Sequence, residues 1–387
     1  MNDPCAPFAW PRSVWEDKAR EMGEAPFRGR QIFDALHRRS VANFGAMSEL
    51  SADARERWAT AVPMALPETV RREASGDGSV KYGLRFSDGA LVEAVFMPRG
   101  EEGAAVSDEL ADARERSAPA PGASGGVPGS SERVASERAT VCLSSQTGCA
   151  VDCRFCVTGR LGAGRNLSGG EIVAQFLAVR REHPAPACSL VFMGMGEPMA
   201  NLENVEAALD VFFETISPRR VTVSTSGFPD GIARIGRRQK QPNLAVSINA
   251  ADDAVREKIM PITKKYPLAQ VLAAMKSFPL THRRRITAEY VLIAGVNDSP
   301  DDARHLARRL RGIPVKINVI PFNPDPRYVP EFQRPSERAV DTFVETLARE
   351  RYTVTVRRSK GPDASAACGQ LKGREADPRR AAGLRPR

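Results

Sequence analysis

Residues 139–159 read ATVCLSSQTGCAVDCRFCVTG. The run over residues 139–145 is short and β-rich, which predicts a buried strand. Cys149, Cys153 and Cys156 follow it within eight residues, at the spacing CxxxCxxC. We therefore expect a metal or redox site in the loop that leaves this strand.

The same order, a β-rich run followed by an amphipathic helical segment, repeats along the chain. One helical segment covers residues 168–182, where Ser168 and Glu171 have the spacing of a capping box. Seven β-rich runs start at Ala139, Cys188, Arg220, Asn243, Ile286, Val315 and Tyr352. Because strand–helix–strand connections favour right-handed crossovers between parallel strands, we predict an α/β fold. The expected architecture is a partial (β/α) barrel of about six units over residues 140–373.

Four other segments flank or precede the barrel. Residues 1–60 carry apolar side chains at helical spacing and predict a small helical module. Residues 61–98 alternate around an Asp88-Gly89 turn, which predicts a β-hairpin region. Residues 99–139 are mostly Ala, Ser, Gly, Pro, Glu and Arg, so we expect a flexible insert. Residues 374–387 form a basic tail that we expect to be disordered.

The charge of the chain favours a polyanionic partner. Its 387 residues contain 56 Lys and Arg against 47 Asp and Glu, a net charge of +9. The insert contains five Arg and eight acids, a charge of −3, so the remaining sequence carries +12. A positive field attracts polyanions over long range and gains from counterion release. One of the basic clusters is Arg283–Arg285.

The composition also argues against a membrane-spanning or a secreted protein. No apolar run approaches the about 18 to 20 residues that a membrane-spanning helix needs. Seven cysteines are an odd number, and the chain starts with no export signal, so a secreted disulfide framework is not expected. We expect a cytoplasmic protein with no membrane partner.

Polar residues and glycines gather at the predicted strand ends, where barrels of this type hold their active sites. These candidate site residues are Gly196, Glu197, Ser224, Ser247, Ile248, Asn249 and Asn323. Several strand ends thus indicate a site on the same face of the barrel.

The cysteine spacing fits an iron–sulfur cluster. Cys149, Cys153 and Cys156 can ligate three irons of a [4Fe–4S] cube and leave the fourth iron without a protein ligand. Two alternatives remain open from the spacing alone. One is a zinc site, although structural zinc normally takes four ligands, and the other is a helical stripe.

CxxxCxxC with Phe155 before the last cysteine resembles the radical S-adenosylmethionine superfamily, which implies a partial barrel. A closer resemblance, to the adenine-C2 RNA methyltransferases that act on ribosomal and transfer RNA, rests on eight strings in order. They are PFRGRQIF (26–33), DGALVEAV (88–95), CLSSQTGCAVDCRFCVTG (142–159), VFMGMGEPMANLENV (191–205), RVTVSTSG (220–227), LAVSINA (244–250), KINVIPFNP (316–324) and DASAACGQL (363–371).

The resemblance implies a radical mechanism that uses one [4Fe–4S] cluster and two S-adenosylmethionine molecules per turnover. The first methylates Cys368, and the second is cleaved reductively to abstract hydrogen from that methyl group. The resulting methylene radical adds to C2 of adenosine, which is too electron-poor to attack an electrophilic methyl group. Glu93 then accepts the C2 proton, and Cys142 releases the covalent adduct by attacking the Cys368 sulfur.

The same resemblance implies the partners. The substrates are large-subunit (23S) ribosomal RNA and transfer RNA, and the reductant is an external protein such as flavodoxin or ferredoxin. We expect a monomer. The N-terminal helices and Arg283–Arg285 are the phosphate contacts that we predict.

The sequence differs from the family pattern in two places, and two alternative functions remain. Asn249 occupies a position where some family members have His, and residues 99–139 separate Glu93 from Cys142 where relatives have a short link. The rivals are a sister enzyme that methylates C8 of adenine and a non-catalytic, zinc-stabilised RNA-binding protein.

Overall fold

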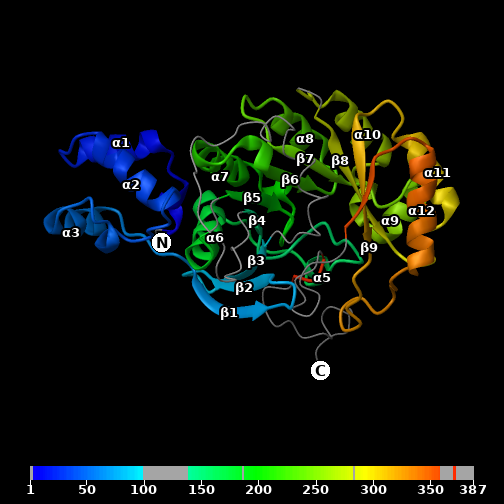
Figure 1. Ribbon diagram of the computed structural model, residues 1–387, viewed down its shortest axis with the longest axis horizontal. Coiled ribbons are helices and arrows are strands. Elements are labelled where there is room, and N and C mark those ends of the chain that lie inside the picture. The colour runs from blue at the N-terminus through cyan, green and yellow to red at the C-terminus, as the bar shows by residue number, and fades with distance from the viewer. Residues whose placement is uncertain (1–2, 99–137, 185–186, 282–283, 358–368, 372–387) are drawn as a thin grey trace, which may run out of the picture.

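The computed structural model describes residues 3–98, 138–184, 187–281, 284–357 and 369–371. Its centre is one ten-stranded sheet whose strands lie in chain order, from β1 to β10 (Figure 1). The predicted insert, apart from Arg138 and Ala139, and the predicted tail lie outside the described residues.

The last seven strands pair in parallel and confirm the seven predicted β-rich runs. They are β4 (Arg138–Cys142), β5 (Ala187–Phe192), β6 (Val221–Thr225), β7 (Asn243–Ser247), β8 (Ile286–Leu292), β9 (Val315–Pro321) and β10 (Val354–Val356). Six helical crossovers join them, so the fold is a partial (β/α) barrel, as predicted.

Helices cover the outer face of the parallel strands (Figure 1). They are α6 (Gly169–Glu182), α7 (Leu202–Thr215), α8 (Pro229–Gly236), α9 (Asp253–Ile259), α10 (Leu268–Ser277), α11 (Pro300–Arg309) and α12 (Glu337–Arg349). The short α5 (Val157–Arg160) follows the cysteine loop instead. The predicted capping box of α6 is present, because the Ser168 side chain accepts from the Glu171 N–H and the Glu171 side chain accepts from the Ser168 N–H.

The hairpin region belongs to the same sheet. The strands β2 (Val80–Arg85) and β3 (Leu91–Pro98) flank the predicted turn, and β3 pairs antiparallel with β4. A further strand, β1 (Glu68–Ala74), was not predicted, because its mostly exposed side chains show no apolar alternation. The structure also corrects the end of the insert, since Arg138 and Ala139 are already part of β4.

The N-terminal module contains α1 (Arg12–Glu21), α2 (Phe27–His37) and α3 (Ala52–Ala61), and it lies beside α6 and α7 (Figure 1). Buried aromatic rings form its centre, Trp15 lying 6.1 Å from Trp58 between ring centroids. The module packs closely on the barrel, because a Cβ added at Gly170 of α6 would lie 2.0 Å from the Cys5 carbonyl oxygen. None of the helices in the described residues has the length and apolar character needed to cross a bilayer.

Candidate active site

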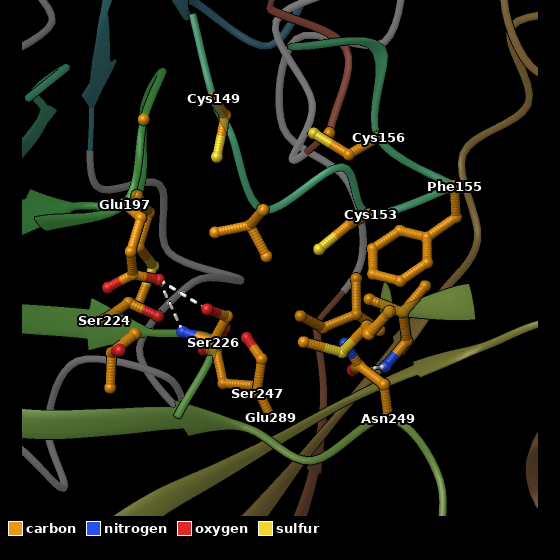
Figure 2. A pocket seen from close by; sticks show the side chains of 18 of the residues that line it. Cys149, Cys153, Phe155, Cys156, Glu197, Ser224, Ser226, Ser247, Asn249 and Glu289 are labelled. Atoms are coloured by element: carbon orange, nitrogen blue, oxygen red, sulfur yellow. Dashed lines mark hydrogen bonds between the residues drawn. The ribbon is translucent and has the colours of Figure 1, made fainter. Parts of the chain in front are cut away.

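The carboxyl ends of the parallel strands surround a cavity (Figure 2). The structure brings together nine predicted site residues in its lining: Cys149, Cys153, Cys156, Gly196, Glu197, Ser224, Ser247, Asn249 and Asn323. They come from five separate segments of the chain, so the convergence predicted from the strand ends is confirmed. Ile248 differs, because its side chain is buried in the core outside the lining.

The cysteine loop directs its three thiols into one space at the cavity (Figure 2). Two backbone hydrogen bonds hold the loop, one from the Cys149 N–H to the Gly162 carbonyl at 2.9 Å and one from the Arg154 N–H to the Ile259 carbonyl at 2.8 Å. A Cβ at Gly148 would lie 2.5 Å from the Gly162 oxygen. Glycine is therefore required immediately before the first cysteine.

The donor set fits an iron–sulfur cluster. Burial raises the pKa of Cys149 to about 12 and that of Cys153 well above its ordinary value, so both thiolates require positive charge from bound iron. The described residues contain no group of three His, Cys, Asp or Glu side chains placed to hold a single metal ion. Three thiols from one short loop that line a single cavity are a ligand set that a [4Fe–4S] cluster uses, with its fourth iron left without a protein ligand.

Glu197 links the end of β5 to the end of β6. Its carboxylate accepts from the Met199 N–H at 2.9 Å and from the Ser226 N–H and hydroxyl, each at 2.7 Å (Figure 2). Burial raises the pKa of Glu197, while these hydrogen bonds favour the ionised form. The preceding Gly196 has φ +96°, and a Cβ there would lie 2.6 Å from the Gln146 Cβ. The turn therefore needs glycine.

Asn249 also has a left-handed backbone, with φ +58°. Its side-chain oxygen accepts from the Val291 N–H at 2.8 Å, and its amide nitrogen lies 3.1 Å from the Met260 sulfur. The carbonyl of Asn249 accepts from the Asn297 side chain at 2.6 Å. These bonds fix the end of β7, where Asn249 lines the cavity.

Sequence reasoning missed several lining residues, among them Glu289, Ser226 and Met260. Burial raises the pKa of Glu289, and the Asn318 side chain donates to its carboxylate at 3.3 Å. An acid in the middle of an apolar strand was a signal that could have identified Glu289. Met260 gave no such signal, because methionine is common in ordinary cores.

Glu93 and Cys142 lie on adjacent strands and outside the cavity lining. Cys142 pairs with Val95, and Glu93 is two residues from Val95, so both side chains project from the same face of the sheet. Glu93 is fully buried, with its carboxylate 3.6 Å from the Lys81 ammonium and 3.8 Å from the Arg71 guanidinium. Glu93 is thus a buried acid held beside two cations.

Cys368 lies outside the described residues. The next residue, Gly369, lines the cavity, and its carbonyl accepts from the Val157 N–H at 2.7 Å. The Leu371 carbonyl accepts from the Thr158 hydroxyl at 2.5 Å. Residues 369–371 are therefore anchored to the helix that follows the cysteine loop.

Of the predicted phosphate contacts at Arg283–Arg285, Arg284 needs correction. The Arg284 guanidinium donates to the Pro242 carbonyl at 2.6 Å and to the Asn243 side chain at 2.8 Å, before β8 and at the start of β7. Arg285 donates to the Thr353 hydroxyl. The Arg284 guanidinium therefore donates to groups of the protein itself, at the end of the barrel opposite the cavity. Arg283 lies outside the described residues.

Comparison with known proteins agrees with this geometry. Residues 143–310 match the radical SAM superfamily, and residues 13–62 match the ribosomal RNA large subunit methyltransferase N-terminal domain. The dual-specificity RNA methyltransferase RlmN of Anaeromyxobacter dehalogenans is 41% identical over 93% of this chain and 90% of its own length. The chain belongs to the RlmN family of RNA methyltransferases.

Other relatives support the same assignment. RlmN of Geotalea uraniireducens is 43% identical over 91% of this chain and 92% of its own length. A crystal structure of a radical SAM methyltransferase from Sphaerobacter thermophilus has a TM-score of 0.81 and 35% identity, covering 95% of this chain and 99% of that one. The chain is therefore an S-adenosylmethionine-dependent RNA methyltransferase of the radical type, with a [4Fe–4S] cluster and S-adenosylmethionine as cofactors.

Proposed function

We propose that the enzyme methylates C2 of an adenosine in large-subunit (23S) ribosomal RNA and in transfer RNA. The observation that carries the proposal is one cavity that joins three cysteine thiols, a Gly196-Glu197 turn and the chain directly after Cys368. The printed names of the relatives, which are dual-specificity RNA methyltransferases, support two RNA substrates.

Cys149, Cys153 and Cys156 would hold the cluster, because their thiols face the same space. When bound, the cluster supplies an open iron for the amino and carboxylate groups of S-adenosylmethionine and the electron that cleaves its sulfonium. Glu197 offers carboxylate oxygen to the ammonium group of the cofactor. Ser224, Ser247, Asn249 and Asn323 offer hydrogen bonds to its ribose, carboxylate or adenine from the walls of the same cavity. Ile248 would contribute only backbone at the end of β7.

Cys368 would carry the methyl group, and Cys142 would release the product. The Cys142 thiolate attacks the Cys368 sulfur, and the bond from that sulfur to the adduct carbon breaks. The carbon takes the electron pair and a proton to become the methyl group, and the two sulfurs form a disulfide. The unpaired electron that radical addition left on the base passes to a one-electron acceptor, a role that the oxidised cluster would supply. Two electrons from an external thiol reductant restore the pair.

Glu93 would take the proton from C2. It projects from the same face of the sheet as Cys142, and its backbone carbonyl accepts from the Ser144 hydroxyl at 2.6 Å. Lys81 and Arg71 place two basic side chains 3.6 and 3.8 Å from the carboxylate. A buried acid between two basic side chains thus suits the role of the general base.

Mass spectrometry of the purified enzyme tests the methyl-carrier role directly. We expect the peptide that contains Cys368 to carry one additional methyl group, and Cys368→Ala to abolish methylation with normal iron content. Turnover by Cys368→Ala would disprove this role. Nucleoside analysis of the product separates the two regiochemistries, since a product methylated only at C8 would contradict methylation at C2.

Replacement of Cys142 tests product release. Cys142→Ala should accumulate a covalent protein–RNA species that survives denaturing electrophoresis, because no second thiol breaks the bond to the adduct. Cys188→Ala is the matched control, since Cys188 lies on the neighbouring strand β5 away from the cavity lining. Release of free methylated RNA by Cys142→Ala would rule out its role as the resolving thiol.

We further propose that residues 1–60 bind RNA, that flavodoxin or ferredoxin donates the electron, and that the enzyme works as a cytoplasmic monomer. The match of residues 13–62 to a ribosomal RNA methyltransferase N-terminal domain supports the first point. The need for a one-electron reductant supports the second point, and the RNA substrates named for the relatives support a cytoplasmic enzyme.

A further inference from the structure

Arg256 of α9 is a fully buried arginine with no place in the chemistry described above. We infer that Arg256 is a positioning residue, which holds the ends of β6 and β7 in the geometry that binds S-adenosylmethionine. The inference rests on the proposed function only in placing that cofactor in the cavity.

The Arg256 guanidinium spans two strand ends that are distant in sequence. It donates to the Ser226 carbonyl at 2.7 Å, just beyond β6. It also donates to the carbonyls of Ser247 and Ile248, at 3.1 and 3.0 Å, where β7 ends. A fourth bond runs from the Arg256 Nη1 to the Thr263 hydroxyl at 3.0 Å.

These bonds reach the cavity through residues that line it. Ser226 and Ser247 are lining residues, and Ser226 holds the Glu197 carboxylate through its N–H and its hydroxyl. A continuous chain of hydrogen bonds therefore runs from Glu197 through Ser226 and Arg256 to Ser247. Figure 2 shows its first link, between Ser226 and Glu197. Ile259, in the same helix as Arg256, accepts through its carbonyl the hydrogen bond from the Arg154 N–H of the cysteine loop.

Only arginine can make this set of contacts. Its planar guanidinium presents five N–H donors in fixed directions, whereas the lysine ammonium has three donors on one atom. Burial lowers the pKa of Arg256 to about 10, so the group keeps its charge and all its donors at neutral pH. Arg256→Lys would retain the charge and lose the simultaneous contact with both strand ends.

The test compares S-adenosylmethionine binding by full-length, anaerobically reconstituted enzymes. For Arg256→Lys we expect normal iron content and a rise of about tenfold or more in the Kd for S-adenosylmethionine, the size typical of lost supporting contacts around a metal site. The cofactor-dependent change in the electron paramagnetic resonance spectrum of the reduced cluster should require correspondingly more S-adenosylmethionine.

Arg284→Lys is the matched control. Arg284 also donates to the backbone, at the Gln241 and Pro242 carbonyls, but near the start of β7, opposite the cavity. Arg284→Lys should lower the melting temperature and leave the Kd unchanged. An unchanged Kd in Arg256→Lys, or an equal rise in both variants, would overturn the inference.

Two further variants distinguish a wrong placement of the cofactor from a wrong role for Arg256. Glu197→Gln reports on the cavity itself, and an unchanged Kd there would refute the placement of the cofactor rather than the role of Arg256. Should Arg256→Lys fail to fold, Thr263→Val removes one acceptor of the guanidinium and leaves Arg256 in place. We expect a several-fold higher Kd, and a wild-type Kd in that variant would equally overturn the inference.

Discussion

Gly196 illustrates how a single backbone position can control the cavity. With φ +96° and Gln146 atoms 2.6 Å from where a Cβ would be, Gly196→Ala introduces both backbone strain and a steric clash. We expect a loss of stability of about 1–3 kcal/mol and a large loss of S-adenosylmethionine binding, measured by calorimetry. Gly312→Ala is the control, because Gly312 has φ +81° with nothing within 4 Å. Equal binding by both variants would contradict a steric role for Gly196.

His37 makes the stability of the enzyme depend on pH. Burial, and secondarily the charge of Arg180, lowers the pKa of His37 from 6.5 to about 3. Below pH 6.5 the unfolded chain binds a proton that the folded chain does not, so acid favours unfolding. The free energy of unfolding should therefore fall by up to about 1.4 kcal/mol per pH unit between pH 6.5 and 3, with no such loss above 6.5.

Urea unfolding at pH 7.5 and 5.5 measures this effect. His37→Leu should show a smaller loss of stability between the two pH values than the wild type. The exposed His305 of α11 provides the control, since His305→Gln should retain the wild-type loss. Indistinguishable losses in His37→Leu and the wild type would show that His37 is not the source.

At the level of elements, Arg165 joins the hairpin to the barrel. It donates to Asp88 in the β2–β3 turn at 2.7 Å and to both oxygens of Glu171, in the first turn of α6, at 2.7 and 2.6 Å. Glu93 lies on β3, so this junction helps to hold the proposed base. The partial exposure of Arg165 and Asp88 limits the stabilisation to about 1–2 kcal/mol.

Arg165→Gln should therefore increase amide hydrogen exchange around Asp88 and slow methylation, with little change in iron content. Arg304→Gln is the control, because Arg304 forms an exposed ion pair with Asp301 within α11. Such a pair contributes at most about 0.5 kcal/mol. Unaltered exchange around Asp88 in Arg165→Gln would mean that the junction does not restrain the hairpin.

For the whole molecule, the net charge of +9 predicts RNA binding that weakens as the salt concentration rises. The logarithm of the RNA association constant should fall linearly with the logarithm of the KCl concentration, because each contacted phosphate releases counterions. Fluorescence anisotropy with a labelled RNA measures the slope. The Kd for S-adenosylmethionine without RNA should vary much less. A flat response of RNA binding would show that charge does not govern it.

Most of the barrel could be predicted from local pattern. The seven parallel strands and the capped helix α6 follow from residue spacing within short windows. The exposed edge strand β1 could not be found in this way, because little of it is buried. For Arg284, the local pattern gave a wrong prediction. The cluster of arginines suggested phosphate contacts, but in the folded chain this side chain donates to backbone carbonyls.

The cysteine loop and the set of strand-end residues follow from the order of residues alone, because covalent spacing places three thiols in one loop and parallel strands end at one edge of a sheet. Folding was needed to show that Glu93 projects from the same face as Cys142 and lies beside Lys81, because strand register determines which side chains meet. The position of Arg256 between two strand ends likewise depends on folding. A buried guanidinium takes whichever carbonyls folding brings within reach, and local spacing does not specify them.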